Sequence, residues 1–351
     1  MFYKKPVKLP QMQSPNLDSI TYHTVKTEDG WYISLTHIKP KQYNPKIRYP
    51  IGAVHGFCQN RKAWKSGQWT TLMIEQGADI YLIELRGHGL SGKKNNPDLY
   101  KAGRGHDYCF DHYVAYDLPA ALQFIKRNAG KDEVFLAGHS LGGMLGYAAL
   151  PERGDIRGLI SLGAPVQMDK KHSLINFLSK LEWIVDPPLA GELYREKIKR
   201  VPVKHALGVV RALLPIVNRA NIFHDLWKKE NMNDNELKII LGEGSSDATT
   251  KLVTQLFRWI KEEEFRSYTD LNHFSWDTDY KARIADIEQP ILLVRGDEDL
   301  LATAENTREL HRTRGKLEEI VVPSTNHLGL TMGISVQEFY HTMVDYLIRY
   351  S

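Results

Sequence analysis

Three things are scarce in this sequence: cysteine, long hydrophobic runs and an excess of either charge. Among its 351 residues only Cys58 and Cys109 carry a thiol, so at most one disulfide could form and a disulfide-based scaffold is excluded. No uncharged run reaches the roughly 18 residues that cross a bilayer. No apolar stretch follows the first basic residues as in a secretion signal. We therefore expect a cytoplasmic protein.

The charge balance excludes further classes of partner. Lysine and arginine number 46 against 42 aspartate and glutamate, an excess too small for a nucleic-acid-binding surface. We find no phosphate-binding glycine loop and expect no cofactor. With 42% hydrophobic and 25% charged residues, the composition is that of a globular protein that can build a large core.

Short apolar runs alternate with helical patterns along most of the chain. Alternating residues on both sides of Asp29-Gly30 predict a β-hairpin near the N-terminus. The later spacing predicts right-handed βαβ units, and hence an α/β fold with a mostly parallel sheet and helices on both faces. Strands are expected at 50–54, 79–85, 134–137, 156–163, 290–294 and 317–322. Helices are expected over 68–77, over 111–128 and from a capping box at Ser335, with a loop over 92–107.

The alternation stops between residues 166 and 287, where only helical periodicity remains. We expect this stretch to be a helical cap or lid, inserted into a core formed by 21–165 and 288–351, with 1–20 as an N-terminal surface segment. Two shared helical faces are expected in the cap, one of Val203, Leu207, Val210 and Leu214, the other of Leu252, Leu256, Trp259 and Ile260.

One part of the expected cap is both basic and apolar. Residues 169–219 carry ten Lys/Arg and five Asp/Glu. These charges are interleaved with Leu174, Phe177, Leu178, Leu181, Trp183, Ile184 and Val185. Two interpretations stay open: a cap core with solvated basic faces, or a lid that makes transient contact with a membrane or lipid interface.

The stretch Gly138-His139-Ser140-Leu141-Gly142 lies between an apolar run and a helix of small residues. A serine between two glycines at a strand–turn–helix junction is typical of a nucleophile elbow, in which the hydroxyl stands at the helix N-terminus. There the backbone N–H groups favour negative charge. The alternative is a serine in an ordinary loop. The elbow predicts that Ser140 is a nucleophile.

A serine nucleophile needs a base, and the base needs a carboxylate. His327 follows the last expected strand, and chain order selects it from 14 histidines. Three carboxylates follow the penultimate strand, in Asp297-Glu298-Asp299. The spacing of three residues after Gly296 favours Asp299 as the acid, and Asp297 stays an alternative.

Two backbone N–H groups are expected to form an oxyanion hole. One belongs to Leu141, the residue after the nucleophile, and the other to Phe57 in the turn His55-Gly56-Phe57 after the first core strand. His55 and His139 are expected to support turns. A metal site at His106, Cys109, Asp111 and His112 is the weaker hypothesis, because the spacing fits no zinc pattern. We expect no metal.

With these residues in place, the chain resembles the α/β-hydrolase superfamily. Within it, three stretches resemble the acid lipases, the gastric and lysosomal triacylglycerol and cholesteryl ester hydrolases: Thr27-Glu28-Asp29-Gly30-Trp31, His55-Gly56-Phe57, and Phe110-Asp111 with Tyr116-Asp117-Leu118-Pro119-Ala120. Leu141 and Arg86-Gly87-His88-Gly89-Leu90-Ser91 are instead similar to the broader bacterial-type esterases. The resemblance implies an α/β-hydrolase fold and hydrolysis of an ester with a hydrophobic acyl chain under a mobile lid.

The sequence thus predicts a serine hydrolase of small-molecule or lipid esters that works through an acyl-enzyme. An acyltransferase or thioesterase stays open, because water, alcohols and thioesters use the same acyl-enzyme chemistry. A non-catalytic binding module on the same fold is the alternative from another class. Serine at position 140 argues against dehalogenases and epoxide hydrolases, which use aspartate there.

Overall fold

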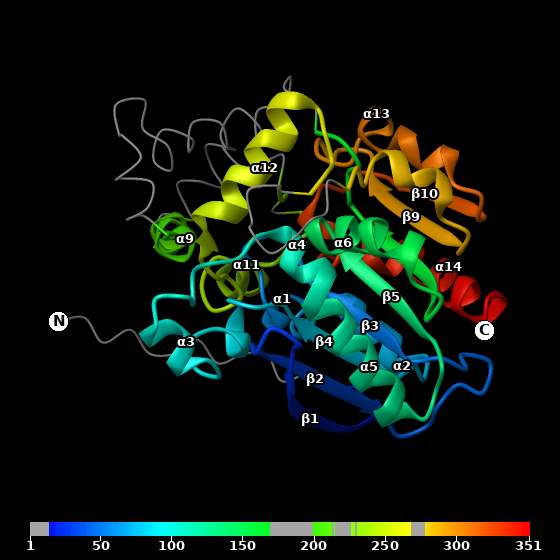
Figure 1. Cartoon of the computed structure of the whole chain (residues 1–351). Coiled ribbons are helices and arrows are strands. Elements are labelled where there is room, and N and C mark those ends of the chain that lie inside the picture. Colours follow the sequence, from blue (N-terminus) through cyan, green and yellow to red (C-terminus); the bar gives the residue numbers. More distant parts are fainter. Residues whose placement is uncertain (1–13, 169–198, 213, 215–225, 229, 268–277) are drawn as a thin grey trace.

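The computed structural model describes residues 14–168, 199–212, 214, 226–228, 230–267 and 278–351. In this part of the chain, an eight-stranded sheet in the order β1-β2-β4-β3-β5-β6-β9-β10 runs through the centre, with helices on both faces (Figure 1). The strands are β1 (Leu17–Lys26), β2 (Tyr32–Pro40), β3 (Ile51–Val54), β4 (Ile80–Glu84), β5 (Val134–His139), β6 (Ile156–Leu162), β9 (Ile291–Gly296) and β10 (Leu317–Val322). The predicted α/β fold is confirmed.

The strand directions bring several loops to one edge of the sheet. Strand β2 pairs antiparallel with β1 and β4, and all other neighbours are parallel. Val54 at the end of β3 is in register with Gly138, and His139 at the end of β5 with Leu162. Likewise, Gly296 and Val322 are in register at the ends of β9 and β10. The loops after these strands therefore meet at the carboxyl edge, where open parallel sheets place their sites.

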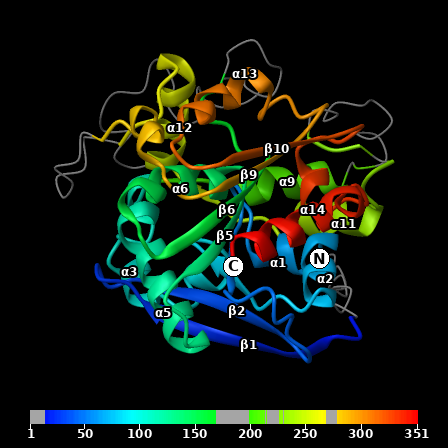
Figure 2. The ribbon, with the colours of Figure 1, turned by 90° about the vertical axis from the view of Figure 1, so that its right-hand side faces the viewer.

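The inner strands β3, β4, β5, β6 and β9 are buried on both faces, which explains their near-continuous apolar sequences. Leu136 of β5 packs with the side chains of α5 and α6, whereas Phe135 and Ala137 pack with those of α2 and α14. Figure 2 shows these two helix pairs on opposite sides of the sheet. The helices are α1 (Arg61–Lys65), α2 (Gln68–Glu75), α3 (Pro97–Lys101), α4 (Phe110–His112), α5 (Leu118–Ala129), α6 (Leu141–Ala149), α9 (Val203–Ala212), α11 (Asp234–Ile240), α12 (Thr250–Glu262), α13 (Ala304–Thr307) and α14 (Val336–Arg349).

The predicted N-terminal hairpin is present, and its first strand already begins at Leu17. Gly30 takes a φ of +89° in the turn, a conformation that glycine adopts without steric cost. The N–H of Thr27 donates to the carbonyl of Trp31 at 2.8 Å and closes the turn. The Asp29-Gly30 signal therefore located the hairpin correctly.

A buried arginine joins two of the three stretches on which the acid lipase resemblance was based, 27–31 and 116–120. The guanidinium of Arg86, after β4, donates to Asp29 at 2.6 and 2.9 Å and to Asp117 at 2.8 Å. Its carbon lies 5.2 Å from the ring centre of Trp31 and 5.5 Å from that of Tyr116. The hairpin turn, the end of β4 and the approach to α5 are thus fixed to one another by a fully buried charge.

Two predictions about local structure are wrong in detail. The expected loop 92–107 contains α3, and the expected helix 111–128 is divided into α4, a π-helical turn (Tyr113–Asp117) and α5. Pro119 at the start of α5 has no N–H to continue the preceding hydrogen-bond ladder. The carboxylate of Asp117 at the same junction is held by Arg86. Both features favour a π-helical turn at this position, within a helical run that continues over 110–129.

The predicted capping box at Ser335 is also wrong. Ser335 has α-helical backbone angles, and its side chain makes no capping hydrogen bond. The chain instead enters α14 through a preceding turn, in which Val336 donates to Gly333 at 3.3 Å and Gln337 to Ile334 at 3.0 Å. A turn that already bends the chain removes the extended geometry that an N-cap side chain requires.

Between β6 and β9, the described residues form α9, α11 and α12, together with the antiparallel strands β7 (Arg200–Val201) and β8 (Ala248–Thr249), which were not predicted. The face of α12 is confirmed: Leu252, Trp259 and Ile260 are buried in the main core, with Leu256 packed against it. On α9 the prediction holds in part, because Val203 packs on a different cluster from Leu207 and Val210.

In the described part of the chain, every helix is too short or too polar to cross a bilayer.

The apolar residues 174–185 of the basic stretch lie outside the described residues. The division of the chain into a surface segment, core and cap stays a prediction.

Candidate active site

Ser140 stands at a strained junction between β5 and α6. Its φ of +53° and ψ of −118° lie in a region that a non-glycine residue rarely adopts. A Cβ at Gly138 would come within 2.4 Å of the Gly142 backbone, and one at Gly142 within 2.4 Å of the Val54 carbonyl. Both glycines are therefore required for the turn, as the sequence motif predicts.

The backbone around Ser140 is held on both sides. Its N–H donates to the carbonyl of Leu162 on β6 at 2.9 Å, and its carbonyl accepts from Gly143 and Met144 at 2.9 and 3.1 Å. The serine thus caps a nine-residue helix, whose N-terminal N–H groups and dipole favour negative charge nearby.

His327 and Asp299 form a buried hydrogen-bonded pair. The Nδ1–H of His327 donates to Oδ2 of Asp299 at 2.9 Å, and the two residues are 4% and 2% exposed. The other oxygen of Asp299 accepts the N–H groups of Leu301 at 2.9 Å and Ala302 at 3.2 Å. Burial alone would raise the pKa of Asp299, but the His327 imidazole and these N–H groups outweigh it and hold the pKa below its ordinary value.

The two candidate acids make different contacts. Asp299 contacts His327, whereas Oδ1 of Asp297 accepts the N–H of Thr325 at 3.2 Å. Asp297 thereby fastens the turn that presents His327. The third carboxylate, Glu298, forms an ion pair with Lys228, which lies in the stretch predicted to be the cap. The geometry favours Asp299 as the orienting acid and gives Asp297 a supporting role.

Gly163, directly after β6, lies against the hydrogen-bonded pair of His327 and Asp299. It has a φ of +59°, and a Cβ on it would lie 2.8 Å from Oδ2 of Asp299 and 3.2 Å from Nδ1 of His327. Any side chain here would press on the hydrogen bond between acid and base. Sequence reasoning treated Gly163 only as a strand end, and its one signal was a glycine at the carboxyl edge of the sheet.

The expected oxyanion turn lies next to Ser140. A Cβ on Gly56 would be 3.2 Å from the Cβ of Ser140, and the N–H of Gly56 donates to Oε1 of Gln59 at 3.0 Å. The N–H of Phe57 donates to no acceptor in the described part of the chain. Leu141 is the first residue of α6, where N–H groups have no intrahelical partner. Both N–H groups are thus available to a developing oxyanion.

His139 connects this turn to the segment of the candidate base. Its Nδ1 lies 3.1 Å from Oε1 of Gln59, and its Nε2 lies 3.1 Å from the carbonyl oxygen of His327. Burial and the neighbouring His327 lower the pKa of His139 to about 3, so the ring is neutral and can donate to only one of the two oxygens. Gln59 is a second contact that sequence reasoning missed.

His55 supports the same turn from behind. Its Nε2 accepts the N–H of Leu85 at 3.2 Å, and its Nδ1 lies 2.9 Å from the carbonyl of Gly56. Burial lowers its pKa well below the ordinary histidine value, with His88 contributing in the same direction. A neutral His55 therefore links the ends of β3 and β4.

Residues of the alternative metal site, Cys109 and Asp111, contact other side chains of the protein. Sγ of Cys109 lies 3.5 Å from Nδ1 of His112 and 3.6 Å from Oδ2 of Asp111. Asp111 also accepts from the hydroxyl of Tyr280 at 2.8 Å. Burial raises the pKa of the Cys109 thiol well above its ordinary value, so it is held as a thiol. In the described ranges, no three His, Cys, Asp or Glu side chains are grouped as a metal site requires.

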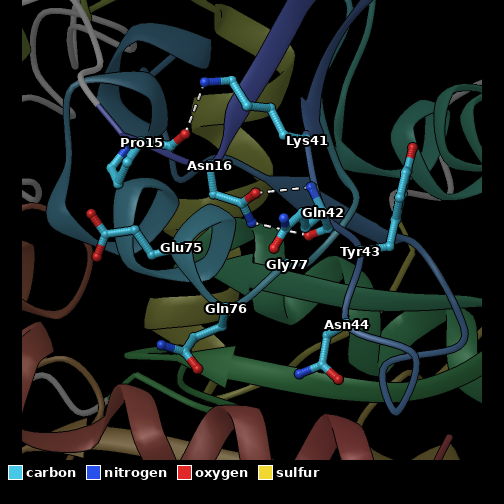
Figure 3. A pocket seen from close by; sticks show the side chains of 9 residues that line it. All are labelled: Pro15, Asn16, Lys41, Gln42, Tyr43, Asn44, Glu75, Gln76 and Gly77. Atoms are coloured by element: carbon cyan, nitrogen blue, oxygen red, sulfur yellow. Dashed lines mark hydrogen bonds between the residues drawn. The ribbon is translucent and has the colours of Figure 1, made fainter.

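A hollow of about 480 Å³ lies away from Ser140 (Figure 3). Its lining residues include Asn44 and Gly77, which precede β3 and β4, so it faces the amino edge of the parallel strands. The side chain of Asn16 within it bonds to the backbone N–H and carbonyl of Gln42 at 2.9 and 3.0 Å. Its polar groups thus serve the protein's own backbone.

A family model of the alpha/beta hydrolase fold matches residues 49–331, which is most of the chain. The chain belongs to the alpha/beta hydrolase fold family. This alpha/beta hydrolase is 25% identical over 344 residues to a probable lipase of Schizosaccharomyces pombe, covering 89% of this chain and 71% of that protein. It is 22% identical to human lipase member J, covering 92% and 94%, and 23% identical to rat lysosomal acid lipase/cholesteryl ester hydrolase, covering 93% and 88%. The predicted likeness to the lipase and esterase branch is confirmed.

Solved structures agree on the fold of this alpha/beta hydrolase. The monoacylglycerol lipase of Paleococcus ferrophilus superposes with a TM-score of 0.54 at 18% identity, covering 95% of this chain and all of that one. A thioesterase domain from the curacin biosynthetic pathway gives a TM-score of 0.52 at 19% identity, with coverage of 95% and 100%. At such low identity these likenesses show the fold alone.

Proposed function

We propose that this protein is a carboxylic ester hydrolase in which Ser140 attacks the ester carbonyl, His327 acts as base and Asp299 orients the base. The observation that carries this proposal is a strained serine between β5 and α6, at the sheet edge where a buried His–Asp pair also lies. Nucleophile, acid and base follow one another in the chain order typical of this fold. The lipase names of the relatives support the reaction class.

The hydrogen bond to Asp299 keeps the proton of neutral His327 on Nδ1 and leaves the lone pair on Nε2. Nε2 takes the hydroxyl proton as Ser140 Oγ bonds to the ester carbonyl carbon. The resulting oxyanion accepts the N–H groups of Phe57 and Leu141. The imidazolium then protonates the departing alcohol, which leaves an acyl-enzyme. Water, deprotonated by the same nitrogen, releases the acid and restores Ser140.

The proposed substrates are esters with hydrophobic acyl chains, lipid esters among them. The relatives that support this are lipases and a cholesteryl ester hydrolase, each aligned with about nine-tenths of this chain. Phe57 and Leu141 supply the two proposed oxyanion donors through their backbone N–H groups. Their side chains would therefore border the acyl group. A bulky apolar border favours acyl chains over charged acids.

The decisive experiment is removal of the Ser140 hydroxyl. Ser140→Ala should lower kcat on p-nitrophenyl butyrate by at least about 10³-fold and abolish labelling by a fluorophosphonate probe, because no other group replaces the nucleophile. Ser19→Ala is the control, since the exposed hydroxyl of Ser19 donates to the neighbouring Asp18 on β1, far from the candidate site. Undiminished turnover by Ser140→Ala would refute the assignment.

We also propose that the cap makes transient contact with a lipid interface. The side of α9 that supports this exposes Val209, at 53%, beside exposed Lys204 and His205. An apolar side chain beside the cation of Lys204 suits an anionic interface. Activity on long-chain esters should then rise once they form an emulsion. Turnover of short soluble esters alone would mean that the cap only covers the site.

A further inference from the structure

The cap is hydrogen-bonded to the turn that presents His327. The side-chain amide of Asn231 donates to the carbonyl of Ser324 at 2.5 Å, and the N–H of Ile334 donates to the carbonyl of Asn231 at 2.9 Å. Ser324 has a φ of +50°, a left-handed conformation that a non-glycine residue rarely adopts. Asn231 therefore holds a strained residue that lies three positions before His327.

The residue after His327 is held by the cap as well. The N–H of Leu328 donates to the carbonyl of Leu226 at 3.0 Å. The side chain of Leu328 is buried in a cluster with Trp227 and Met232 from the same cap segment. The candidate base is thus fixed on both sides, at Ser324 and at Leu328, by residues that precede α11.

The residues that follow α11 are bound to the oxyanion turn. The side-chain amide of Asn60 donates to the carbonyls of Glu243 at 2.9 Å and Ser245 at 3.3 Å, and its N–H donates to Gly244 at 3.0 Å. The N–H of Ser246 donates to the carbonyl of Cys58 at 2.7 Å. Cys58 directly follows Phe57, the proposed oxyanion donor.

Helix α11 links these two attachment points. Its seven residues span about 10 Å. A capping box closes its start: the side chain of Asn233 accepts from Glu236 N at 3.0 Å, and that of Glu236 accepts from Asn233 N at 3.0 Å. Leu237 and Ile240 are buried against Ala63 of α1. A short helix that is capped and packed along one face is a stiff connection.

We propose that the cap segment formed by 226–228 and 230–246 is a brace that sets the position of the candidate base relative to the oxyanion turn, with Asn231 and Asn60 as positioning residues at its two ends. The brace rests on the proposed function, because the positions of His327 and Phe57 affect the rate only if His327 is the base and Phe57 an oxyanion donor. A displacement of 1 Å at either end would misplace the proton acceptor or the oxyanion donor, which can cost up to about 10²-fold in rate. This part of the cap therefore stays in place during turnover.

Isosteric variants separate the brace from ordinary packing. Asn231→Asp keeps the shape of the side chain but cannot donate to the Ser324 carbonyl. Asn60→Asp likewise loses its bonds to Glu243 and Ser245, while its Oδ1 can still accept the N–H of Lys62. Asn235→Asp on the exposed first turn of α11 adds the same charge without losing either contact, and it is the matched control.

The readouts are kcat and KM on a short soluble ester and the rate of fluorophosphonate labelling, all measured well below the unfolding transition. Asn231→Asp and Asn60→Asp should each lower kcat and the labelling rate about tenfold, with KM changed less than about twofold, because alignment and not binding is lost. The kcat and labelling rate of the double variant should be little lower than those of the less active single variant, because either change releases the same brace. Asn235→Asp should match the wild type.

Two results overturn the brace: single variants that label and turn over like Asn235→Asp, or losses that multiply in the double variant as for independent contacts. Failure of the proposed function is distinguishable. In that case the wild type itself is not labelled and Ser140→Ala keeps its turnover, and the brace proposal is rejected together with the proposed function.

Discussion

Gly163 lies so close to Asp299 that a methyl group on its Cα would sit 2.8 Å from Oδ2, the oxygen that accepts the hydrogen bond of His327. Because Gly163 has no side chain, Asp299 and His327 can stay in contact. The φ of +59° at Gly163 adds a second reason for glycine.

Gly163→Ala should therefore lower kcat by about 10- to 100-fold, because the methyl group must displace the carboxylate or the imidazole. The left-handed backbone adds a loss of roughly 1–2 kcal/mol in the free energy of unfolding. The control is Gly154→Ala, where a Cβ meets nothing within 4 Å. Steady-state kinetics and urea unfolding measure the two effects. Equal kcat for both variants would contradict the predicted contact.

Asp299→Asn should lower kcat by about 10³- to 10⁴-fold, because an amide no longer holds the Nδ1–H tautomer or stabilises the imidazolium. Asp297→Asn keeps an oxygen that can accept the N–H of Thr325, so its kcat should fall less than about tenfold. The comparison uses kcat/KM on one ester at constant pH. The reverse order of the two variants would make Asp297 the acid.

His139 should make the protein less stable in acid. Its pKa is lowered to about 3 by burial and by His327, whereas in the unfolded chain it takes the ordinary value near 6.5. As the pH falls from about 6.5 towards 3, the unfolded chain binds a proton that the folded protein does not, so stability decreases over this window. His139→Gln removes this term and should flatten the dependence by about 1.4 kcal/mol per pH unit.

Urea unfolding at pH 7, 6 and 5 measures the slope, which is independent of any constant loss that the substitution causes. His311→Gln at an exposed position is the control. An unchanged slope in His139→Gln would mean that folding does not lower the pKa of His139.

Asp117→Asn should destabilise the protein by about 3 kcal/mol, because it leaves the fully buried guanidinium of Arg86 with one carboxylate in place of two. Asp18→Asn at the exposed pair with Lys39, 3.7 Å apart, should cost less than about 0.5 kcal/mol. Chemical unfolding of both variants tests the difference. Similar small losses would show that the Arg86 cluster contributes no more than a surface pair.

Local patterns predicted the hairpin, the core strands and the elbow. Each depends on a few adjacent residues. Gly30 permits the positive φ of the hairpin turn, an apolar run precedes Ser140, and a side chain at Gly138 or Gly142 would clash with the backbone of the elbow. The errors arose where a distant contact outweighed the local pattern. The side chain of Asp117 is held by Arg86 at the π-helical turn, and the capping serine at position 335 is already within a turn.

The candidate site was predictable as a set of residues but not as an arrangement. Asp297 and Asp299 follow the same strand end, so their spacing alone left both open. Their partners, Thr325 and His327, lie about 28 residues away and become distinguishable only when β9 and β10 pair. Gln59 and Asn231 carried no motif, because an amide reveals its role only through the groups it meets.

The sequence by itself determined that a nucleophile elbow, an acid and a histidine follow three strands of one parallel sheet, because apolar period, glycine placement and chain order are local properties. Only the tertiary structure decided which carboxylate meets His327, that Gly163 lies against the pair, and that residues on either side of α11 contact both the turn before His327 and the turn after β3. These are contacts between side chains and backbone far apart in the chain, and their geometry exists only once the sheet and the cap have folded around them.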